Sequence, residues 1–136
     1  MRISFNLEIL MNHKILVVDD DRDILTVLQI LLAQNNYTVE SIFRWEQIDK
    51  TIEVFAPDLI LLDISLAGAD GRTICKQLKS RSETKHIPII LFSANMNVEK
   101  SFTECNANDF IAKPFEINNL VKKVFANLKS SNTTHS

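Results

Sequence analysis

Five short apolar runs, each followed by a segment with helical spacing, restrict this chain to an alternating strand and helix architecture. The runs are apolar at nearly every position, which is typical of strands buried on both faces of a parallel sheet. In the intervening segments apolar residues recur every three or four positions, so each helix has one face to bury. The fold class is therefore predicted to be α/β, a parallel sheet covered by helices on both sides. The expected strands are at about 14–19, 37–42, 58–63, 88–92 and 109–112, and the expected helices at about 22–35, 45–55, 71–81, 97–104 and 116–128.

The length and charge of the chain exclude several classes of protein. Its 136 residues suffice for one domain that buries about two-thirds of its surface without a disulfide or a structural metal. A net charge of −2 argues against direct nucleic-acid binding, and no apolar run approaches the roughly 18 residues that would span a bilayer. Cys75 and Cys105 lack CxxC spacing, which favours reduced thiols in a core. We expect a cytoplasmic protein.

The two ends of the chain differ in composition from its middle. Residues 1–12 precede the first strand and are expected to be an N-terminal extension. Either they form a further element, or Met11 is the natural start, which we favour. The folded domain is expected to cover residues 13–129. Residues 130–136 offer nothing apolar to bury, so a disordered tail is predicted there.

Two of the predicted strands end on acidic residues. The strand at 58–63 stops on Asp63, and the first strand runs into Asp19, Asp20 and Asp21. A buried strand tolerates a charge only at its rim, and the carboxyl ends of parallel strands share one edge of the sheet. Carboxylates crowded there repel each other unless a proton or a cation lies among them, and oxygen ligands suit Mg2+. The alternative is that each acid is solvated in a loop.

The fourth and fifth strands add a hydroxyl and a cation to the same rim. Ser93 follows the fourth strand, and Lys113 follows the fifth. Phosphoryl transfer requires such a set, because its transition state spreads negative charge over oxygens that a metal ion and a lysine stabilise. As the solitary acid of its strand end, Asp63 is the candidate acceptor of a phosphoryl group. The paired Asp19 and Asp20 fit a metal-holding role.

Five short motifs occur in a fixed order along the chain. They are Val17-Val18-Asp19-Asp20-Asp21, Leu61-Leu62-Asp63, Asp70-Gly71, Ser93-Ala94 and Lys113-Pro114-Phe115. There are 43 positions from Asp20 to Asp63, 30 from Asp63 to Ser93 and 20 from Ser93 to Lys113. Each motif alone is common, whereas the set in this order is specific. Over about residues 14–128 the chain resembles the receiver domains of bacterial two-component response regulators, the CheY-like family.

The resemblance implies a fold and a metal site. The fold would be a doubly wound, flavodoxin-like sheet of five parallel strands in the order 2-1-3-4-5, flanked by five helices. Asp63 would be the phosphoacceptor, Asp20 a direct ligand of Mg2+, and Asp19 an acid that acts on the ion largely through water. The backbone carbonyl of Ser65 would complete the metal site. Mg2+ is the implied cofactor.

The resemblance also assigns roles at the later strand ends. Ser93 would hydrogen-bond the phosphoryl group, and Lys113 would hold the acceptor carboxylate before transfer and a phosphoryl oxygen after it. The Lys113-Pro114 peptide bond is usually cis in the family. Phe110 stands at the position of the family's switch aromatic, where it would rotate into space that Ser93 leaves. The alternative is that Phe110 simply packs beneath a helix.

The chain departs from the family pattern in two loops. Residues 64–71 lack the proline that usually follows the position of Leu66, so a looser loop is expected after the acceptor. The stretch from Ser93 to Lys113 is shorter than usual and contains several asparagines, which are poor helix formers. We therefore expect a short, mobile fourth helix. Because that helix belongs to the usual partner surface, the type of partner does not carry over with the site.

The implied function is a phosphorelay signalling module rather than an enzyme with a separate substrate. Asp63 would accept a phosphoryl group from a histidine kinase or a histidine phosphotransfer protein. The domain itself would catalyse this Mg2+-dependent step and the later dephosphorylation. We expect no effector domain after residue 130, so the output is either binding of a downstream protein or onward transfer to a second histidine. Two alternatives are a phosphate-independent docking domain and a phosphohydrolase with an aspartyl nucleophile.

Overall fold

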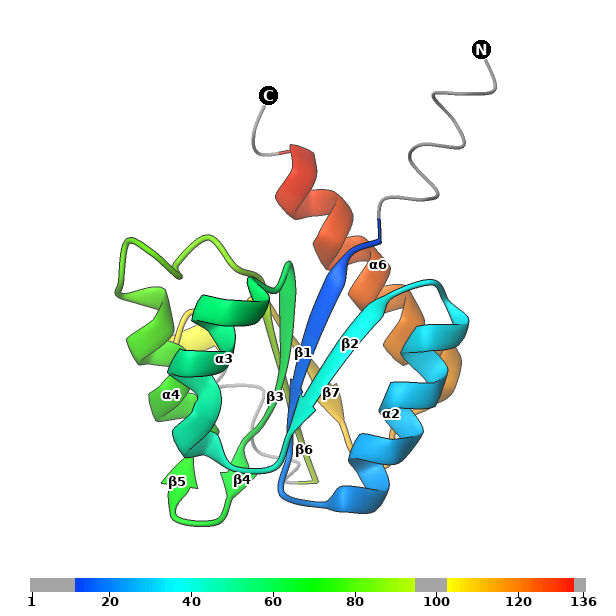
Figure 1. Cartoon of the computed structure of the whole chain (residues 1–136), viewed down its shortest axis with the longest axis horizontal. Helices are drawn as coiled ribbons and strands as arrows, with labels where there is room; N and C mark the ends of the chain where they lie inside the picture. The colour runs from blue at the N-terminus through cyan, green and yellow to red at the C-terminus, as the bar shows by residue number, and fades with distance from the viewer. Residues whose placement is uncertain (1–11, 95–102, 134–136) are drawn as a thin grey trace.

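The computed structural model describes residues 12–94 and 103–133, and it has helices on both faces of one parallel sheet (Figure 1). Each of the five predicted strands is confirmed, with bounds within one residue of those expected. In chain order the elements are β1 (Lys14–Val18), α2 (Arg22–Gln34), β2 (Thr38–Ile42), the 3-10 turn η1 (Trp45–Gln47), α3 (Ile48–Phe55), β3 (Leu59–Asp63), β4 (Ser65–Leu66), β5 (Ala69–Asp70), α4 (Gly71–Lys79), β6 (Ile89–Ser93), β7 (Asp109–Ala112) and α6 (Ile117–Thr133).

The parallel sheet has its strands in the order β2-β1-β3-β6-β7. Counted among these five strands alone, the order is the predicted 2-1-3-4-5, so the fold class is confirmed. β3 lies at the centre, paired with β1 on one side and with β6 on the other, where Asp63 stands opposite Phe92. Because all the pairings are parallel, the carboxyl ends of the five strands meet at one edge of the sheet.

Alternate residues of the central strands point into two separate cores. The first core lies between the sheet and helices α3 and α4, and the second between the sheet and helices α2 and α6 (Figure 1). In β1, Leu16 and Val18 belong to the first core, while Ile15 and Val17 belong to the second. Full burial of such a side chain stabilises the fold by about 2 kcal/mol. Burial on both faces explains why the strands are unbroken apolar runs.

Two helices differ from their predicted bounds by three residues or more. The helix expected at 45–55 is divided into η1 and α3, and α6 continues to Thr133, five residues beyond its predicted end. The backbone of residues 130–133 is therefore helical, which corrects the prediction of a disordered tail at these positions. Serine, asparagine and threonine are weak helix formers, but each added residue contributes one hydrogen bond, and no proline or glycine interrupts the run.

Two predictions concern segments outside the described ranges. Residues 1–11 of the expected N-terminal extension and most of the helix expected near 97–104 belong there. Among the residues that are described, four of the five predicted helices are present, as α2, α3, α4 and α6. None of the helices in this part of the chain is both long and apolar enough to cross a membrane.

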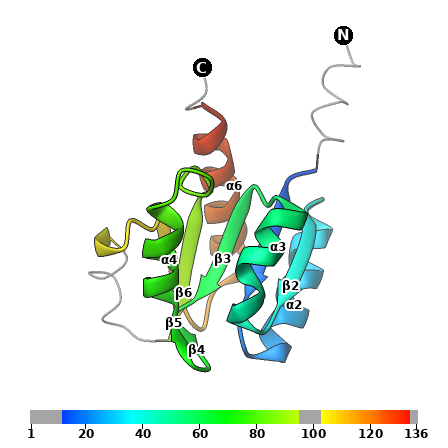
Figure 2. The ribbon, with the colours of Figure 1, turned by 60° about the vertical axis from the view of Figure 1, so that its left-hand side comes forward.

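The loop after β3 has more regular structure than the sequence led us to expect. β4 and β5 form an antiparallel hairpin that pairs Ser65 with Asp70 and Leu66 with Ala69, just beyond the carboxyl end of β3 (Figure 2). Asp70 then caps α4, because its carboxylate accepts a hydrogen bond of 2.8 Å from the backbone N–H of Arg72. Backbone pairing thus gives this loop regular structure, while its looser character remains a prediction.

We expect both cysteines to resist thiol reagents in the folded protein. Cys75 and Cys105 are buried and are not joined in a disulfide, and the Cys75 thiol donates to the backbone carbonyl of Cys105 at 3.5 Å. Burial, reinforced by the neighbouring Cys105, raises the pKa of the Cys75 thiol far above its usual range, and the thiolate is the reactive form. Labelling with a chromogenic disulfide should be slower by a factor of about a hundred or more than in urea-unfolded protein. Rapid labelling of two thiols in folded protein would contradict this packing.

Candidate functional site

Asp63 is the last residue of β3, the central strand of the sheet. All five residues of this strand are buried, and Asp63 is only 4 % exposed. The backbone N–H of Ser65, two residues further along, lowers the pKa of the Asp63 carboxyl group. The carboxylate is therefore held at the rim of the sheet by a strand that is buried along its length and paired on both sides.

The other acids of the site follow β1, the neighbouring strand. Asp19 is fully buried, at 0 % exposed, and Asp20 beside it is exposed. One carboxylate oxygen from each of Asp19, Asp20 and Asp63 lies within 4.8 Å of the other two. The expectation that these strand ends bring their carboxylates together is confirmed.

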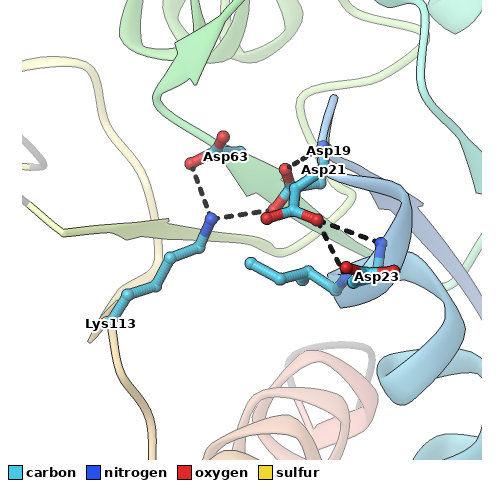
Figure 3. A network of polar contacts seen from close by, with 6 residues as sticks. Asp19, Asp21, Asp23, Asp63 and Lys113 are labelled. Carbon is cyan, nitrogen blue, oxygen red and sulfur yellow. Dashed lines mark hydrogen bonds and ion pairs between the residues drawn. The ribbon is translucent and has the colours of Figure 1, made fainter.

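Lys113 joins two of these acids. Its ammonium lies 2.9 Å from Asp19 Oδ2 and 3.3 Å from Asp63 Oδ1 (Figure 3). The lysine side chain is 15 % exposed, and its nitrogen also lies 4.6 Å from the centre of the Phe92 ring. The Lys113–Pro114 peptide bond is cis, as the resemblance implied. A cation shielded from water in this way interacts strongly with both carboxylates.

The electrostatic environment perturbs the acidity of Asp63. Burial and then the charge of Asp19 raise the pKa of Asp63 to about 6, while Lys113 and the Ser65 N–H act in the opposite direction. Asp63 is therefore mainly ionised at neutral pH but takes up a proton more readily than an ordinary aspartate. Such perturbation by burial and by named charge partners is typical of functional carboxylates.

The donor set fits a hard divalent cation. Three carboxylates and one ammonium leave an excess of two negative charges when all are ionised, and every candidate ligand atom is an oxygen. Mg2+ holds oxygens at about 2.1 Å, so neighbouring ligand atoms lie about 3 to 4 Å apart. Oxygens already within 4.8 Å of one another need only a small closure. Asp19, Asp20 and Asp63, with the Ser65 carbonyl that follows, are the residues that could hold such an ion.

The remaining candidate residues lie around this cluster. Ser93 ends β6 and is 2 % exposed, and its backbone carbonyl accepts a hydrogen bond of 2.8 Å from the backbone N–H of Lys113. Ser93 is therefore held next to the lysine. Phe110 is half-buried in β7 and packs against the first core, one strand away from Asp63 across β6. It lies beside the charged cluster rather than within it.

Sequence reasoning did not predict the structural roles of three residues that shape the site, although two of them, Asp21 and Gly71, belong to the motifs quoted above. Asp21 caps α2 through its side chain, and its backbone N–H donates to Asp19 Oδ1 at 2.9 Å. An aspartate immediately before a helix was a usable signal for that cap. Trp45 donates a hydrogen bond to the hairpin of β4 and β5, and Gly71 lies against the backbone of Asp63. No local pattern in the sequence indicates either of these contacts.

Taken chemically, the site holds a partly desolvated carboxylate, a place for a divalent cation, a fixed ammonium and a buried hydroxyl. A carboxylate nucleophile with cationic groups beside it can accept a phosphoryl group, because the developing charge falls on oxygens that the cations neutralise. The arrangement lies at the carboxyl ends of the strands, where open parallel sheets bind their ligands.

Comparison with known proteins identifies relatives of this arrangement. Residues 15–125 match the family described as the response regulator receiver domain. A putative response regulator from Chloroflexus aurantiacus is 32% identical, with a TM-score of 0.82, over 87% of this chain and 98% of that one. The signal receiver domain of a signal transduction histidine kinase from Syntrophus aciditrophicus is 28% identical, with a TM-score of 0.80, over 87% and 91%. The beryllofluoride-activated N-terminal receiver domain of RstA from Klebsiella pneumoniae is 31% identical, with a TM-score of 0.76, over 85% and 98%.

Proposed function

Because the chain belongs to the response regulator receiver domain family, we propose that Asp63 accepts a phosphoryl group and thereby controls a signalling output. The observation that carries the proposal is the contact of one shielded ammonium with two buried carboxylates. Lys113 reaches both Asp19 and Asp63, and a second cation is needed before all the acids are neutralised. An uncompensated negative charge of this kind favours binding of a cation, and with it of a phosphoryl group, over a purely structural role.

The proposed step is an in-line transfer from a nitrogen or an acyl oxygen to the carboxylate. An oxygen of Asp63 attacks the phosphorus, a P–O bond forms, and the P–N bond of a phosphohistidine breaks with its electron pair remaining on the imidazole. The product is an aspartyl phosphate. With a pKa of about 6, the Asp63 carboxylate is available as the nucleophile at neutral pH without a separate base.

The residues around Asp63 would stabilise the charge that moves during transfer. Bound Mg2+, held by Asp19, Asp20, Asp63 and the Ser65 carbonyl, would provide positive charge beside the phosphoryl oxygens. Lys113 would exchange its contact with Asp63 for one with a phosphoryl oxygen, and the Ser93 hydroxyl would donate to another. A movement of Ser93 would leave space for Phe110, which would shift the equilibrium between two arrangements of the β6 and β7 ends.

The donor in this proposal is a histidine kinase or a histidine phosphotransfer protein, and the module would work in the cytoplasm. Its domain covers residues 13–129, with residues 1–12 as an extension. The domain catalyses its own phosphorylation and dephosphorylation. The output is either binding of a downstream protein or onward transfer to a second histidine, and measuring return of the phosphoryl group to a histidine-containing protein separates these two outputs.

Incubation with acetyl phosphate and Mg2+ tests the proposal directly. Intact-protein mass spectrometry should show the addition of one phosphoryl group to the wild type and none to Asp63→Asn. Asp58→Asn is the matched control, because Asp58 is an exposed aspartate immediately before β3 and its side chain accepts from the Lys14 N–H, which asparagine can replace. This variant should be phosphorylated like the wild type.

Two outcomes would contradict the proposal. Equal phosphorylation of the wild type and Asp63→Asn would show that a residue other than Asp63 accepts the phosphoryl group. No phosphorylation of the wild type, together with no change on adding beryllofluoride and Mg2+, would favour a phosphate-independent docking domain. The related RstA receiver domain was obtained in a beryllofluoride-activated form, which supports the use of this phosphoryl mimic.

A further inference from the structure

The hairpin of β4 and β5 is the segment that connects the candidate acceptor to α4. It has only two residue pairs, Ser65 with Asp70 and Leu66 with Ala69. An isolated two-stranded hairpin is marginally stable at best, so a hairpin this short requires tethers to the rest of the protein. Its position matters because Ser65, in the first pair, follows the candidate acceptor Asp63 by only two residues.

The base of the hairpin is held against the end of β3. The backbone N–H of Gly71 donates to the carbonyl of Ile64 at 2.8 Å. A Cβ atom on Gly71 would lie 2.2 Å from the Asp63 carbonyl oxygen and 2.9 Å from the Ile64 Cα atom. The two ends of the hairpin therefore approach as closely as backbones can, and only glycine permits it.

The tip of the hairpin is held by Trp45. The indole N–H donates to the backbone carbonyl of Ala67 at 3.1 Å, across 22 positions of sequence. Trp45 belongs to η1, which follows β2, and its ring is half-buried against the first core. Gly68, with φ +83°, completes the turn, and a Cβ there would lie 3.6 Å from the indole nitrogen. The indole is thus anchored in the core at one side and bonded to the turn at the other.

We propose that Trp45 is a positioning residue of the phosphorylation site, because its hydrogen bond holds the hairpin tip and so fixes the backbone of Ser65. Ser65 lies two residues beyond Asp63, at the start of the hairpin, and the Ser65 carbonyl is part of the proposed Mg2+ site. This inference rests on the proposed function, because the position of the hairpin matters for function only if Asp63 is phosphorylated and Mg2+ binds beside it. Trp45 itself touches neither the phosphoryl group nor the ion.

The size of the effect follows from the hydrogen bond. Loss of one such bond changes the equilibrium between a held and a released hairpin by about three- to tenfold. In Trp45→Phe the dissociation constant for Mg2+, measured by titration calorimetry, should therefore rise by at most this factor, because the ion binds only those molecules whose hairpin is held. Hydrogen–deuterium exchange of the amides of residues 65–69 in metal-free protein should accelerate by a similar factor. Exchange of the amides of β1 should accelerate less, because β1 is tied into the sheet on both sides.

Two further variants separate the hydrogen bond from packing. A benzothiophene analogue of tryptophan at position 45 keeps the shape of the ring but lacks the N–H donor, so it should reproduce the effects of Trp45→Phe. Tyr37→Phe is the matched control, because Tyr37 is a half-buried aromatic residue that packs against the second core, on the opposite face of the sheet. It should change neither the Mg2+ affinity nor the exchange of the hairpin.

The outcomes distinguish this inference from the proposed function. Unchanged hairpin exchange and Mg2+ affinity in Trp45→Phe, with Asp63 still phosphorylated in the wild type, would overturn the positioning role alone. Equal acceleration in the hairpin and in β1 would reduce Trp45 to a general contributor to stability and would also overturn it. Faster hairpin exchange and weaker Mg2+ binding, in a protein whose Asp63 is never phosphorylated, would leave the positioning of the metal site intact and overturn the proposed function.

Discussion

Gly71→Ala is expected to lower the free energy of unfolding by roughly 3 kcal/mol, at the upper end of what overpacking costs. The added methyl group would lie 2.2 Å from the Asp63 carbonyl oxygen. Both contacting groups are backbone, so α4 or the end of β3 must shift to accommodate it. Alanine is the better helix former by about 1 kcal/mol, but Gly71 is the first residue of α4, and the clash outweighs this gain. Urea unfolding followed by circular dichroism measures the difference.

Gly68→Ala is the matched control for this prediction. Gly68 has φ +83°, and the nearest atom to an added Cβ is 3.6 Å away. Only backbone strain of about 1 kcal/mol is expected there. Gly68 lies in the turn of the hairpin and Gly71 immediately follows it, so a smaller loss in Gly71→Ala than in Gly68→Ala would show that the close approach at Asp63 relaxes freely. That result would contradict the tight junction described above.

Lys113→Met is expected to have the second large effect, a loss of about 3 kcal/mol in the Mg2+-free protein at neutral pH. The variant leaves Asp19 and Asp63 buried near each other without their cation, and breaking a buried ion pair by removing one partner is strongly destabilising. Adding Mg2+ should restore part of the loss. The rate of phosphorylation by acetyl phosphate should fall about a hundredfold, which is typical of removing one charge-stabilising group. Denaturant unfolding and mass spectrometry measure the two effects.

The loss in Lys113→Met should depend on pH in a defined direction. The pKa of Asp63 is about 6 in the folded protein, above its ordinary value of 3.8, so the folded state binds more protons than the unfolded state between these limits. Stability therefore falls as the pH rises through this range. Because Lys113 lowers the pKa of Asp63, the pKa of Asp63 should be still higher in Lys113→Met. Its stability should recover as the pH is lowered from 7 to 5, more than that of the wild type.

Lys123→Met provides the comparison for Lys113→Met. Lys123 pairs with Asp109 at 3.3 Å, but both side chains are about one-third exposed, so water screens the pair and its loss should cost less than about 1 kcal/mol. Equal destabilisation by the two lysine substitutions, or a loss in Lys113→Met that does not change with pH, would contradict a buried cluster of charges.

The sequence predicted the parts of the protein that follow from local patterns. The strands β1 and β3 are unbroken apolar runs, as expected for strands buried on both faces of a sheet. The ends of each run therefore predict the ends of each strand. The rule that parallel strands end at one edge of the sheet predicted that the carboxylates of Asp19 and Asp63 lie together. Their proposed roles in phosphoryl transfer and metal binding remain predictions.

The sequence could not predict contacts that depend on how distant segments pack. Trp45 and Ala67 are 22 positions apart, and nothing near either residue indicates that an indole reaches a backbone carbonyl. The regular structure of the loop after Asp63 was not predicted, because a missing proline is visible in the sequence whereas the pairing of Ser65 with Asp70 is not. The helical backbone at 130–133 was not predicted, because the composition of these residues alone disfavours a helix. Extending an existing helix costs less than starting a new one, and α6 precedes them.

The two edges of the parallel sheet differ in how much change they can tolerate. Every group of the candidate site lies at the carboxyl ends of the strands, while the turns at 35–37 and 56–58 lie at the amino ends. Doubling the length of a surface turn costs only about 0.6 kcal/mol of chain entropy. The amino edge is thus the side on which evolution or an engineer can attach insertions and fused modules without rebuilding the carboxylate cluster.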